Sequence, residues 1–270
     1  MTESSSGPGQ KAPRIDPSVP HSARVWNYWL GGKDNYASDR MVGDQVIAMV
    51  PDIARIARLQ RAFLVSAVKY LAGEAGIRQF LDIGTGLPTA NNTHEVAQAI
   101  APESRIVYVD NDPLVLAHAR ALLTSTPQGA CDYIDADVRD PGKILTAAAG
   151  TLDFARPVAL ILLGVLGQIP DSDNPRAIVA QLLDAVPSGS YVALCDGTNT
   201  SEAVNEAIGR YNENSHNAYH LRSPEQITGF FDGLELVEPG IAGLGRWRPE
   251  ATPFPGAGEV PGMCGVGRKP

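Results

Sequence analysis

Three acidic residues lie at or near the ends of three short apolar runs, and their type and spacing suit the binding of a nucleoside. Asp82 lies within the first run, and Asp110 and Asp137 each follow a later one. Side chains at the carboxyl ends of neighbouring parallel strands line the crevice where open α/β sheets bind ligands. We expect Asp110 to accept hydrogen bonds from both hydroxyls of a ribose, and Asp137 to accept one from an adenine amino group. The backbone N–H of Val138 would then reach a ring nitrogen.

A glycine turn follows the first apolar run. Residues 80–88 are typical of a buried strand that enters a turn and then a helix, with Gly84 and Gly86 in the turn. Glycine adopts dihedrals closed to other residues and lets a ligand approach the backbone closely. We expect Gly84 and Gly86 to leave room for the amino-acid part of a cofactor over the edge of the sheet. Asp110 comes 24 residues after Gly86, near the spacing of about 20 between a glycine turn and a ribose-binding acid.

The same turn favours S-adenosylmethionine over a dinucleotide. A dinucleotide fingerprint has a third glycine, and that position is Thr89 in this chain. Asp82 precedes the first glycine by two residues, and its carboxylate would repel a pyrophosphate but could meet the ammonium group of S-adenosylmethionine. An NAD(P)-dependent reductase is therefore the weaker alternative.

Each of these features also has a plain structural interpretation. A lone glycine pair after a strand is often only a tight turn, and Asp137 could be a loop acid that faces water. Asp112 is expected to cap the helix that begins at Pro113, a favourable first helical position. The three sites nevertheless fall in order at successive strand ends, which makes coincidence a poor explanation.

Apolar runs and helical patterns alternate along the chain after residue 77, which indicates an α/β fold with a Rossmann-like, mostly parallel sheet. The run 158–163 is apolar throughout, as expected for a central strand that is buried on both faces. The predicted strands are 79–83, 105–110, 131–136, 157–163, 190–195, 234–237 and 263–266. The predicted helices are 22–30, 39–50, 52–72, 89–100, 113–124, 141–149, 174–186, 201–216 and 224–231.

Composition sets limits on the class of protein. The net charge of -8 and the pI of about 5.1 disfavour a nucleic-acid binder, and the arginines at 55–61 are expected to form a solvated helix face. The absence of an apolar run of about 18 residues argues against a membrane span. The three cysteines have no metal-ligand spacing and are expected to be reduced in a cytoplasmic protein. We divide the chain into a disordered tail (1–14), an N-terminal helical extension (15–76) and a cofactor-binding domain (77–270), with a long loop at 249–262.

Three longer motifs resemble a known family. They are Trp26–Tyr36 (WNYWLGGKDNY), Phe80–Thr89 (FLDIGTGLPT) and Val107–Pro113 (VYVDNDP). Together they are similar to the actinobacterial S-adenosylmethionine-dependent methyltransferase family that was first catalogued as a domain of unknown function. The resemblance covers about Ile15 to Lys269. It implies a class I methyltransferase fold with a seven-stranded sheet and an antiparallel last strand, but no known substrate. The family often carries His-Phe after the fourth strand, where this chain has 164–170 (GVLGQIP), so a histidine base is not expected there.

The polar and aromatic segment around residues 24–35 is expected to fold over the cofactor as a lid, with Gly31 and Gly32 as a hinge. Arg24 or Lys33 would then pair with the methionine carboxylate; the alternative is a capped helix with an aromatic face packed on the core. The full set of expected cofactor residues is Asp82, Gly84, Thr85, Gly86, Asp110, Asn111, Asp137, Val138, Gly164, Arg24, Tyr28 and Lys33.

The methyl acceptor is the part of the function that the residues define least. We expect a small molecule, with a protein acceptor left open, and no metal site. The absence of an obvious base keeps a second hypothesis, a non-catalytic module that binds S-adenosylmethionine or S-adenosylhomocysteine and signals to a partner. No residue is singled out as catalytic; the candidates near the expected mouth are Tyr28, His21, Gln168, Asp196, Asn199 and His220.

Overall fold

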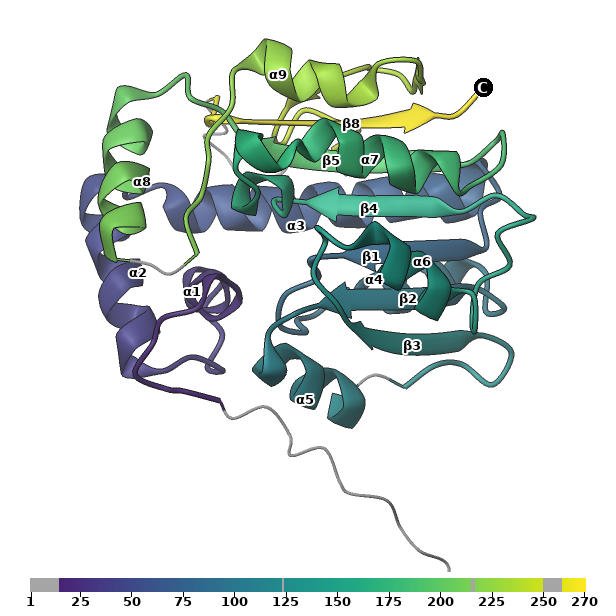
Figure 1. The fold of residues 1–270 in the computed structure, drawn as a ribbon, viewed down its shortest axis with the longest axis horizontal. Coiled ribbons are helices and arrows are strands. Elements are labelled where there is room, and N and C mark those ends of the chain that lie inside the picture. The colour runs from purple at the N-terminus through teal and green to yellow at the C-terminus, as the bar shows by residue number, and fades with distance from the viewer. Residues whose placement is uncertain (1–14, 123, 215–216, 250–258) are drawn as a thin grey trace, which may run out of the picture.

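A mixed sheet organises the computed structural model, which describes residues 15–122, 124–214, 217–249 and 259–270 (Figure 1). Its strands are β1 (Gln79–Ile83), β2 (Arg105–Asp110), β3 (Ala130–Asp135), β4 (Ala159–Leu163), β5 (Tyr191–Gly197), β6 (Glu235–Leu236), β7 (Ala242–Gly243) and β8 (Gly262–Arg268). The strand order is β3-β2-β1-β4-β5-β8-β6, and β7 pairs with β8 beside this path. The strands from β1 to β5 run parallel, whereas β8 runs antiparallel to β5.

This arrangement confirms the mostly parallel sheet with an antiparallel late strand. The expected seven strands are present, and the structure adds β7, a pair of residues that bonds only to β8. So short a strand has no periodic pattern of its own, which is why the sequence does not predict it. The predicted tail 1–14 and most of the predicted loop 249–262 lie outside the described residues.

Helices cover both faces of the sheet. The helices of the described residues are α1 (Ser22–Trp29), α2 (Ala37–Met49), α3 (Ile53–Lys69), α4 (Thr93–Ile100), α5 (Pro113–Leu122), α6 (Pro141–Ala148), α7 (Pro175–Asp184), α8 (Glu202–Asn214) and α9 (Pro224–Thr228). A π-helical turn, Tyr70–Glu74, extends α3. The strand and helix predictions agree with these bounds to within a few residues, except that α4 begins at Thr93 rather than at residue 89.

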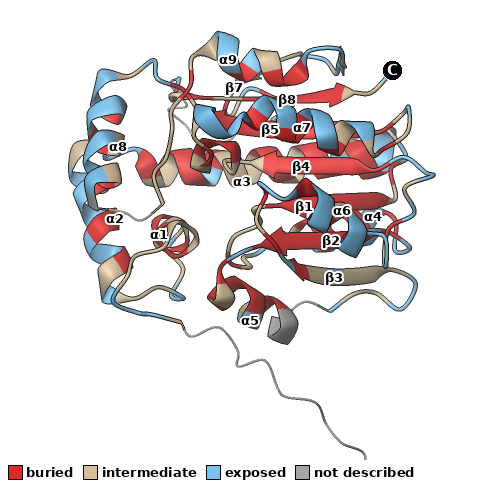
Figure 2. Ribbon diagram, viewed as in Figure 1, coloured by how far each residue is buried: buried red, intermediate tan, exposed pale blue. Residues whose placement is uncertain are grey.

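Alternate residues of the strands divide the core into two halves. Ala159 and Ile161 of β4 join the half formed with α3 and α4, while Leu160 and Leu162 join the half formed with α6, α7 and α9. Both pairs are fully buried, and Figure 2 shows the central strands buried along most of their length. The sequence pattern of an uninterrupted apolar run thus has its expected cause, because side chains of β4 pack against helices on both faces.

The helices α1, α2 and α8 lie together on the side of the sheet toward which β4 runs (Figure 1). The core half that contains α3 also contains apolar residues of these helices, among them Trp29, Val46 and Val204. The predicted helical extension is therefore packed on the same core as the sheet. Among the residues that the structure describes, no helix has both the length and the apolar character needed to cross a membrane.

Candidate functional site

A cavity of about 260 Å³ opens at the carboxyl ends of β1 to β4 and continues between α1, α3 and α8. The predicted cofactor residues that follow the strands all line it. These residues are Asp82, Gly84, Thr85, Gly86, Asp110, Asn111, Asp137, Val138 and Gly164. Parallel strands end at a common edge, so the topology brings together residues that are far apart in the sequence.

The glycine turn after β1 has the geometry of a cradle for a ligand. Gly84 and Gly86 have φ angles of 74° and 67°, in the left-handed region that favours glycine. A Cβ on Gly84 would lie 2.5 Å from the Val165 side chain, whereas a Cβ on Gly86 would meet nothing within 4 Å. Gly84 is therefore required by packing, and Gly86 leaves open space above the backbone on the cavity side.

Asp110 holds the turn in place from the end of β2. Its Oδ2 accepts a hydrogen bond from the Gly86 backbone N–H at 2.9 Å, and its Oδ1 accepts one from the Asp112 backbone N–H at 2.9 Å. Burial raises the pKa of Asp110 despite these two bonds, which act in the opposite direction. The carboxylate thus faces the cavity with a fixed orientation at the position expected for a ribose-binding acid.

Asp82 is buried inside β1, and its bonding partner lies on α4. The Thr93 hydroxyl donates to Asp82 Oδ2 at 2.6 Å. Burial raises the pKa of Asp82 to about 6, although the Thr93 bond and the charge of Arg61 lower it. Such a carboxylate gains from the approach of a cation, because a cation would restore part of the lost solvation.

Asp137 already has partners within the protein. Arg139 donates its Nε to Oδ1 at 2.9 Å and its Nη2 to Oδ2 at 2.6 Å, and Asn111 Nδ2 donates to Oδ2 at 3.3 Å. The hydrogen bond from the Arg139 side chain is the main reason that the pKa of Asp137 is lowered. The expected bond to an adenine amino group stays a prediction, and Arg139 would share the carboxylate with it.

Arg24, Tyr28 and Lys33, the predicted residues of the N-terminal segment, are not among the described lining residues. The Tyr28 hydroxyl donates to Asp44 Oδ1 at 2.6 Å, and Lys33 is exposed. Arg24 is 4% exposed and donates its Nη2 to the Val19 carbonyl at 2.7 Å. In this structure Arg24 and Tyr28 stabilise the N-terminal helices, and the expected carboxylate partner has to be sought elsewhere.

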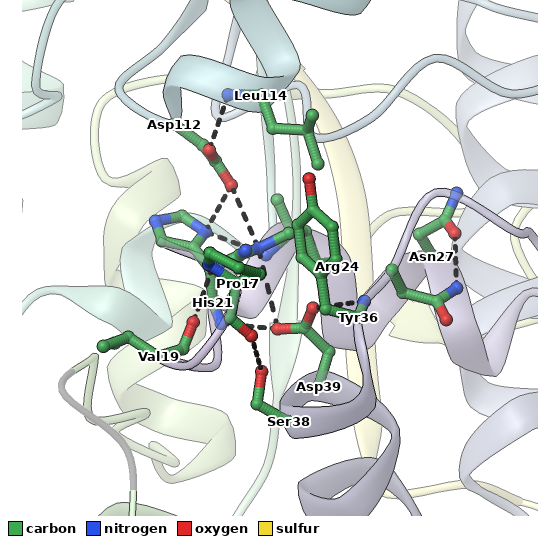
Figure 3. Close-up of polar contacts among 12 residues, drawn as sticks. Pro17, Val19, His21, Arg24, Asn27, Tyr36, Ser38, Asp39, Asp112 and Leu114 are labelled. Atoms are coloured by element: carbon green, nitrogen blue, oxygen red, sulfur yellow. Dashed lines mark hydrogen bonds and ion pairs between the residues drawn. The ribbon is translucent and has the colours of Figure 1, made fainter. Parts of the chain in front are cut away.

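Figure 3 shows the cluster around Arg24, which connects the N-terminal segment to the loop after β2. Arg24 Nε lies 3.6 Å from Asp39 Oδ1 and 3.8 Å from Asp112 Oδ2. His21 Nδ1 lies 2.9 Å from Asp112 Oδ2, and the His21 backbone N–H donates to Asp39 Oδ1 at 2.9 Å. Asp112 Oδ1 accepts from the Leu114 N–H at 2.8 Å, which confirms Asp112 as the cap of α5.

The glycine pair after α1, Gly31 and Gly32, is required by the local turn. Gly31 has a φ of 83°, and a Cβ on Gly32 would lie 2.3 Å from the Asn27 side-chain amide. Asn27 is 3% exposed, and its Oδ1 accepts from the Asp34 backbone N–H at 3.1 Å and from Asn35 Nδ2 at 3.0 Å. The motif therefore forms a turn that closes around Asn27, and its expected role as a hinge stays a prediction.

Two polar residues of α3 that the sequence analysis did not select as site residues also line the cavity. Gln60 donates its Nε2 to the Leu163 carbonyl at 3.1 Å, and Arg61 donates its Nη2 to the carbonyls of Ala90 and Asn91 at 3.1 and 3.0 Å. The expectation of a solvated arginine face is wrong for Arg61, because α3 turns this side chain toward the sheet edge. Helical spacing from the apolar positions of α3 could have indicated this orientation.

Another buried carboxylate, Asp196, lies beside the cavity near the end of β5. Asp196 Oδ1 accepts a short hydrogen bond from the hydroxyl of Tyr219, a lining residue, and Arg222 Nη1 lies 3.8 Å from its Oδ2. Burial raises the pKa of Asp196 to about 6, although the Tyr219 bond and the Arg222 charge lower it. Tyr219 was not predicted, because its segment has no strand or helix pattern of its own.

Of the candidates near the expected mouth, His21 and Gln168 line the cavity. Tyr28, Asp196, Asn199 and His220 are not among the described lining residues. The described residues hold no group of three or more acidic, histidine or cysteine side chains that could bind a metal ion.

Comparison with known proteins shows which family the chain as a whole is similar to. The sequence profile of a family described as S-adenosyl methyltransferase matches residues 8–270 of the chain. A search of curated proteins found no match.

Solved structures agree with the family match. A DUF574 family protein from Streptomyces avermitilis is 44% identical, with a TM-score of 0.92, over 95% of this chain and 100% of that chain. A candidate methyltransferase from Thermobifida fusca is 42% identical, with a TM-score of 0.86, over 93% of this chain and 96% of that chain. A methyltransferase from Anabaena variabilis shares the fold at 12% identity and a TM-score of 0.51, over 96% and 98% of the two chains. The fold is that of the class I methyltransferases.

Proposed function

The chain belongs to the S-adenosyl methyltransferase family, and from that premise we propose that it binds S-adenosylmethionine at the glycine turn and methylates a small molecule held in the same cavity. The single observation that carries the proposal is the arrangement at the sheet edge. There the buried carboxylate of Asp110 is bonded to Gly86, and Gly86 leaves open space on the cavity side. When bound, S-adenosylmethionine supplies a methyl group that is already activated by its sulfonium.

The chain's own residues divide the work of holding this cofactor. Asp110 would accept the ribose hydroxyls, and the buried Asp82 would face the ammonium group, whose charge compensates the lost solvation of the carboxylate. Arg61 lines the same end of the cavity and interacts electrostatically with Asp82. We therefore assign Arg61, in place of Arg24 or Lys33, as the partner of the methionine carboxylate, because an arginine fork suits a carboxylate.

The extent of the cavity supports an enzyme over a non-catalytic sensor. A sensor needs only a pocket that encloses the cofactor, whereas this cavity continues past Gly164 to residues of α1 and α8. Trp26 and Trp29 of α1 line that part, so the N-terminal segment would cover the site as the expected lid. An interior cavity of this kind also favours a small molecule over a protein acceptor.

Titration calorimetry tests the nucleoside site. Asp110→Asn should weaken the binding of S-adenosylmethionine by about a hundredfold. The amide has one accepting oxygen in place of two, and it would have to serve two ribose hydroxyls as well as the backbone N–H groups of Gly86 and Asp112. Asp135→Asn is the matched control, since Asp135 is exposed at the end of β3 and is not a described lining residue. Tighter binding of NADH than of S-adenosylmethionine would replace the proposal with a reductase.

A second pair of variants tests the methionine end. Arg61→Gln should weaken the binding of S-adenosylhomocysteine by at least about tenfold and leave the binding of adenosine unchanged, because only the former carries a carboxylate. The control is Arg58→Gln on the same helix, where Arg58 is exposed. Equal losses for the two ligands would show that Arg61 acts on the fold of the site and not on the carboxylate.

A further inference from the structure

The part of the cavity beyond the cofactor end has an apolar wall. Side chains of α1, α3 and α8, together with one from the segment after β7, form it: Trp26, Trp29, Ile56, Val204, Ile208 and Leu244. Trp26 and Trp29 contact each other edge to face, with ring centroids 5.6 Å apart. A wall of aromatic and branched side chains favours a ligand with a flat apolar body, because such a body buries area against it without leaving polar groups unpaired.

Charge is confined to the opposite end of the cavity. The acidic, basic and histidine residues among the described lining are His21, Arg61, Asp82, Asp110, Asp137 and Arg139. They lie at the ends of β1, β2 and β3 or pair with groups there, as His21 does with Asp112 and Arg139 with Asp137. The described lining residues from α8 onward include no such group. An ionised ligand at the apolar end would lose its hydration without gaining a counter-charge.

One polar side-chain atom of a residue that lines the cavity has no hydrogen-bond partner among the described residues. Gln168 follows β4 and lines the cavity, and its Oε1 is buried without a hydrogen bond to any described residue. Native structures rarely leave a buried polar atom unpaired, so an unpaired amide beside a cavity points to a ligand. A hydroxyl can pair with either end of a primary amide, since it both donates and accepts.

Hydrogen bonds and close packing fix the backbone around Gln168, and the Gln168 side-chain amide takes no part in them. Arg222 donates its Nη1 to the Leu166 carbonyl at 2.8 Å and its Nη2 to the Ile169 carbonyl at 2.6 Å. Gly167 packs so closely on Tyr219 that a Cβ there would lie 2.3 Å from its ring. The turn that carries Gln168 is thus held on both sides, while its side-chain oxygen stays without a hydrogen bond among the described residues.

We propose that the apolar end of the cavity is the acceptor site, and that it takes an uncharged, ring-bearing molecule whose hydroxyl pairs with the Gln168 amide. Calling this site the acceptor site rests on the proposed function, whereas the proposed binding of a neutral ring there does not. A carboxylate on the ring is rejected, because the described lining from α8 onward includes no basic side chain to neutralise it. Gln168 here is a binding residue that selects and places the hydroxyl.

Equilibrium dialysis with three naphthalene probes tests the proposal in the presence of saturating S-adenosylhomocysteine. The probes are 2-naphthol, 2-methylnaphthalene, which replaces the hydroxyl with a methyl group of similar size, and the anion 2-naphthoate. The native protein should bind both neutral probes and bind 2-naphthoate at least about tenfold more weakly. In Gln168→Met the preference for 2-naphthol over 2-methylnaphthalene should fall about fivefold, because the amide is lost while the volume is kept.

Gln45→Met is the matched control, since Gln45 is exposed on α2 and the preference should not change there. Tight binding of 2-naphthoate, an unchanged preference in Gln168→Met, or no binding of either neutral probe would overturn the inference. Calorimetry with S-adenosylhomocysteine on the same samples separates the two proposals. If that ligand fails to bind while 2-naphthol still binds through Gln168, the cofactor assignment falls and the neutral-ring site stands.

Discussion

Two buried carboxylates on opposite sides of the cavity carry opposite shifts in pKa. Asp112 lies where the N-terminal segment meets α5, and Asp196 lies beside Tyr219 at the end of β5. Burial alone would raise the pKa of Asp112, but the hydrogen bond and charge of His21, the Leu114 amide and the charge of Arg24 together lower it. At Asp196 burial wins and the pKa rises to about 6.

The difference lies in what compensates the loss of water. Asp112 has a histidine at 2.9 Å and an arginine at 3.8 Å from the same oxygen. Asp196 has a neutral hydroxyl on Oδ1, and Arg222 Nη1 at 3.8 Å from Oδ2. Neither Oδ2 has a hydrogen bond among the described residues, so the imidazole beside Asp112 is what distinguishes the two carboxylates. A compensated carboxylate ties two segments together, whereas an uncompensated one can take up a proton near neutral pH.

The largest test of this comparison removes the compensation at the first cluster. Arg24→Met should lower the free energy of unfolding by about 3 kcal/mol, because it leaves the buried carboxylates of Asp39 and Asp112 with less positive charge beside them. Denaturant unfolding near neutral pH measures this loss. Arg210→Met is the control, since Arg210 pairs with Glu206 on the exposed surface of α8 and such pairs contribute little. A loss as small as the control's would show that the Arg24 pairs do not stabilise the fold.

A smaller effect is expected from pH at the second cluster. Asp196 has a folded-state pKa of about 6, above its ordinary value of about 3.9, so between these values the folded chain binds a proton that the unfolded chain does not. Acidification from about pH 7 to about pH 4 should therefore raise the stability contributed by Asp196, by on the order of 2 kcal/mol. The unfolding free energy of the native protein minus that of Asp196→Asn should therefore increase by this amount as the pH falls.

Asp112→Asn provides the matched comparison with the opposite sign. The pKa of Asp112 is lowered, so the stability it contributes is present above its ordinary value of about 3.9 and is lost only as the pH falls further. With His21→Asn in both proteins, so that no imidazole titrates beside the carboxylate, the difference between the protein with and without Asp112→Asn should stay constant between about pH 7 and about pH 5. If the differences measured for Asp196→Asn and for Asp112→Asn changed with pH in the same way over this range, the contrast between the two clusters would be contradicted. Taking differences removes the contribution of Asp82, which also has a pKa of about 6.

The sequence predicted most of the sheet, and the meeting of the strand-end residues at one edge, for one physical reason. Strands buried on both faces leave continuous apolar runs, and the residue that follows each run must lie at the shared edge. Asp110 and Gly86 were expected to face one ligand, and the structure joins them directly at 2.9 Å. The helix cap Asp112 was likewise predictable, because capping depends on neighbours in the chain.

The predictions for the N-terminal segment had no such support. Arg24 and Lys33 were selected for their charge and Tyr28 for its place in a dense polar motif, and the described cavity lining includes none of them. Arg24 instead faces two carboxylates, one on α2 and one before α5. Arg61 was assigned to a solvated face, yet it lines the cavity. Charge shows that a side chain needs a partner, but the partner depends on how helices pack.

The sequence by itself determined the elements, their order and the residues placed at the carboxyl ends of the strands, because periodicity and glycine conformation are properties of neighbouring residues. Only the tertiary structure decided which face of α3 meets the sheet edge, that Tyr219 reaches Asp196, and that Gln168 lies unpaired beside an apolar wall. Those contacts join segments separated by many residues. Their free energies depend on burial and on distance in space, which no local pattern in the chain encodes.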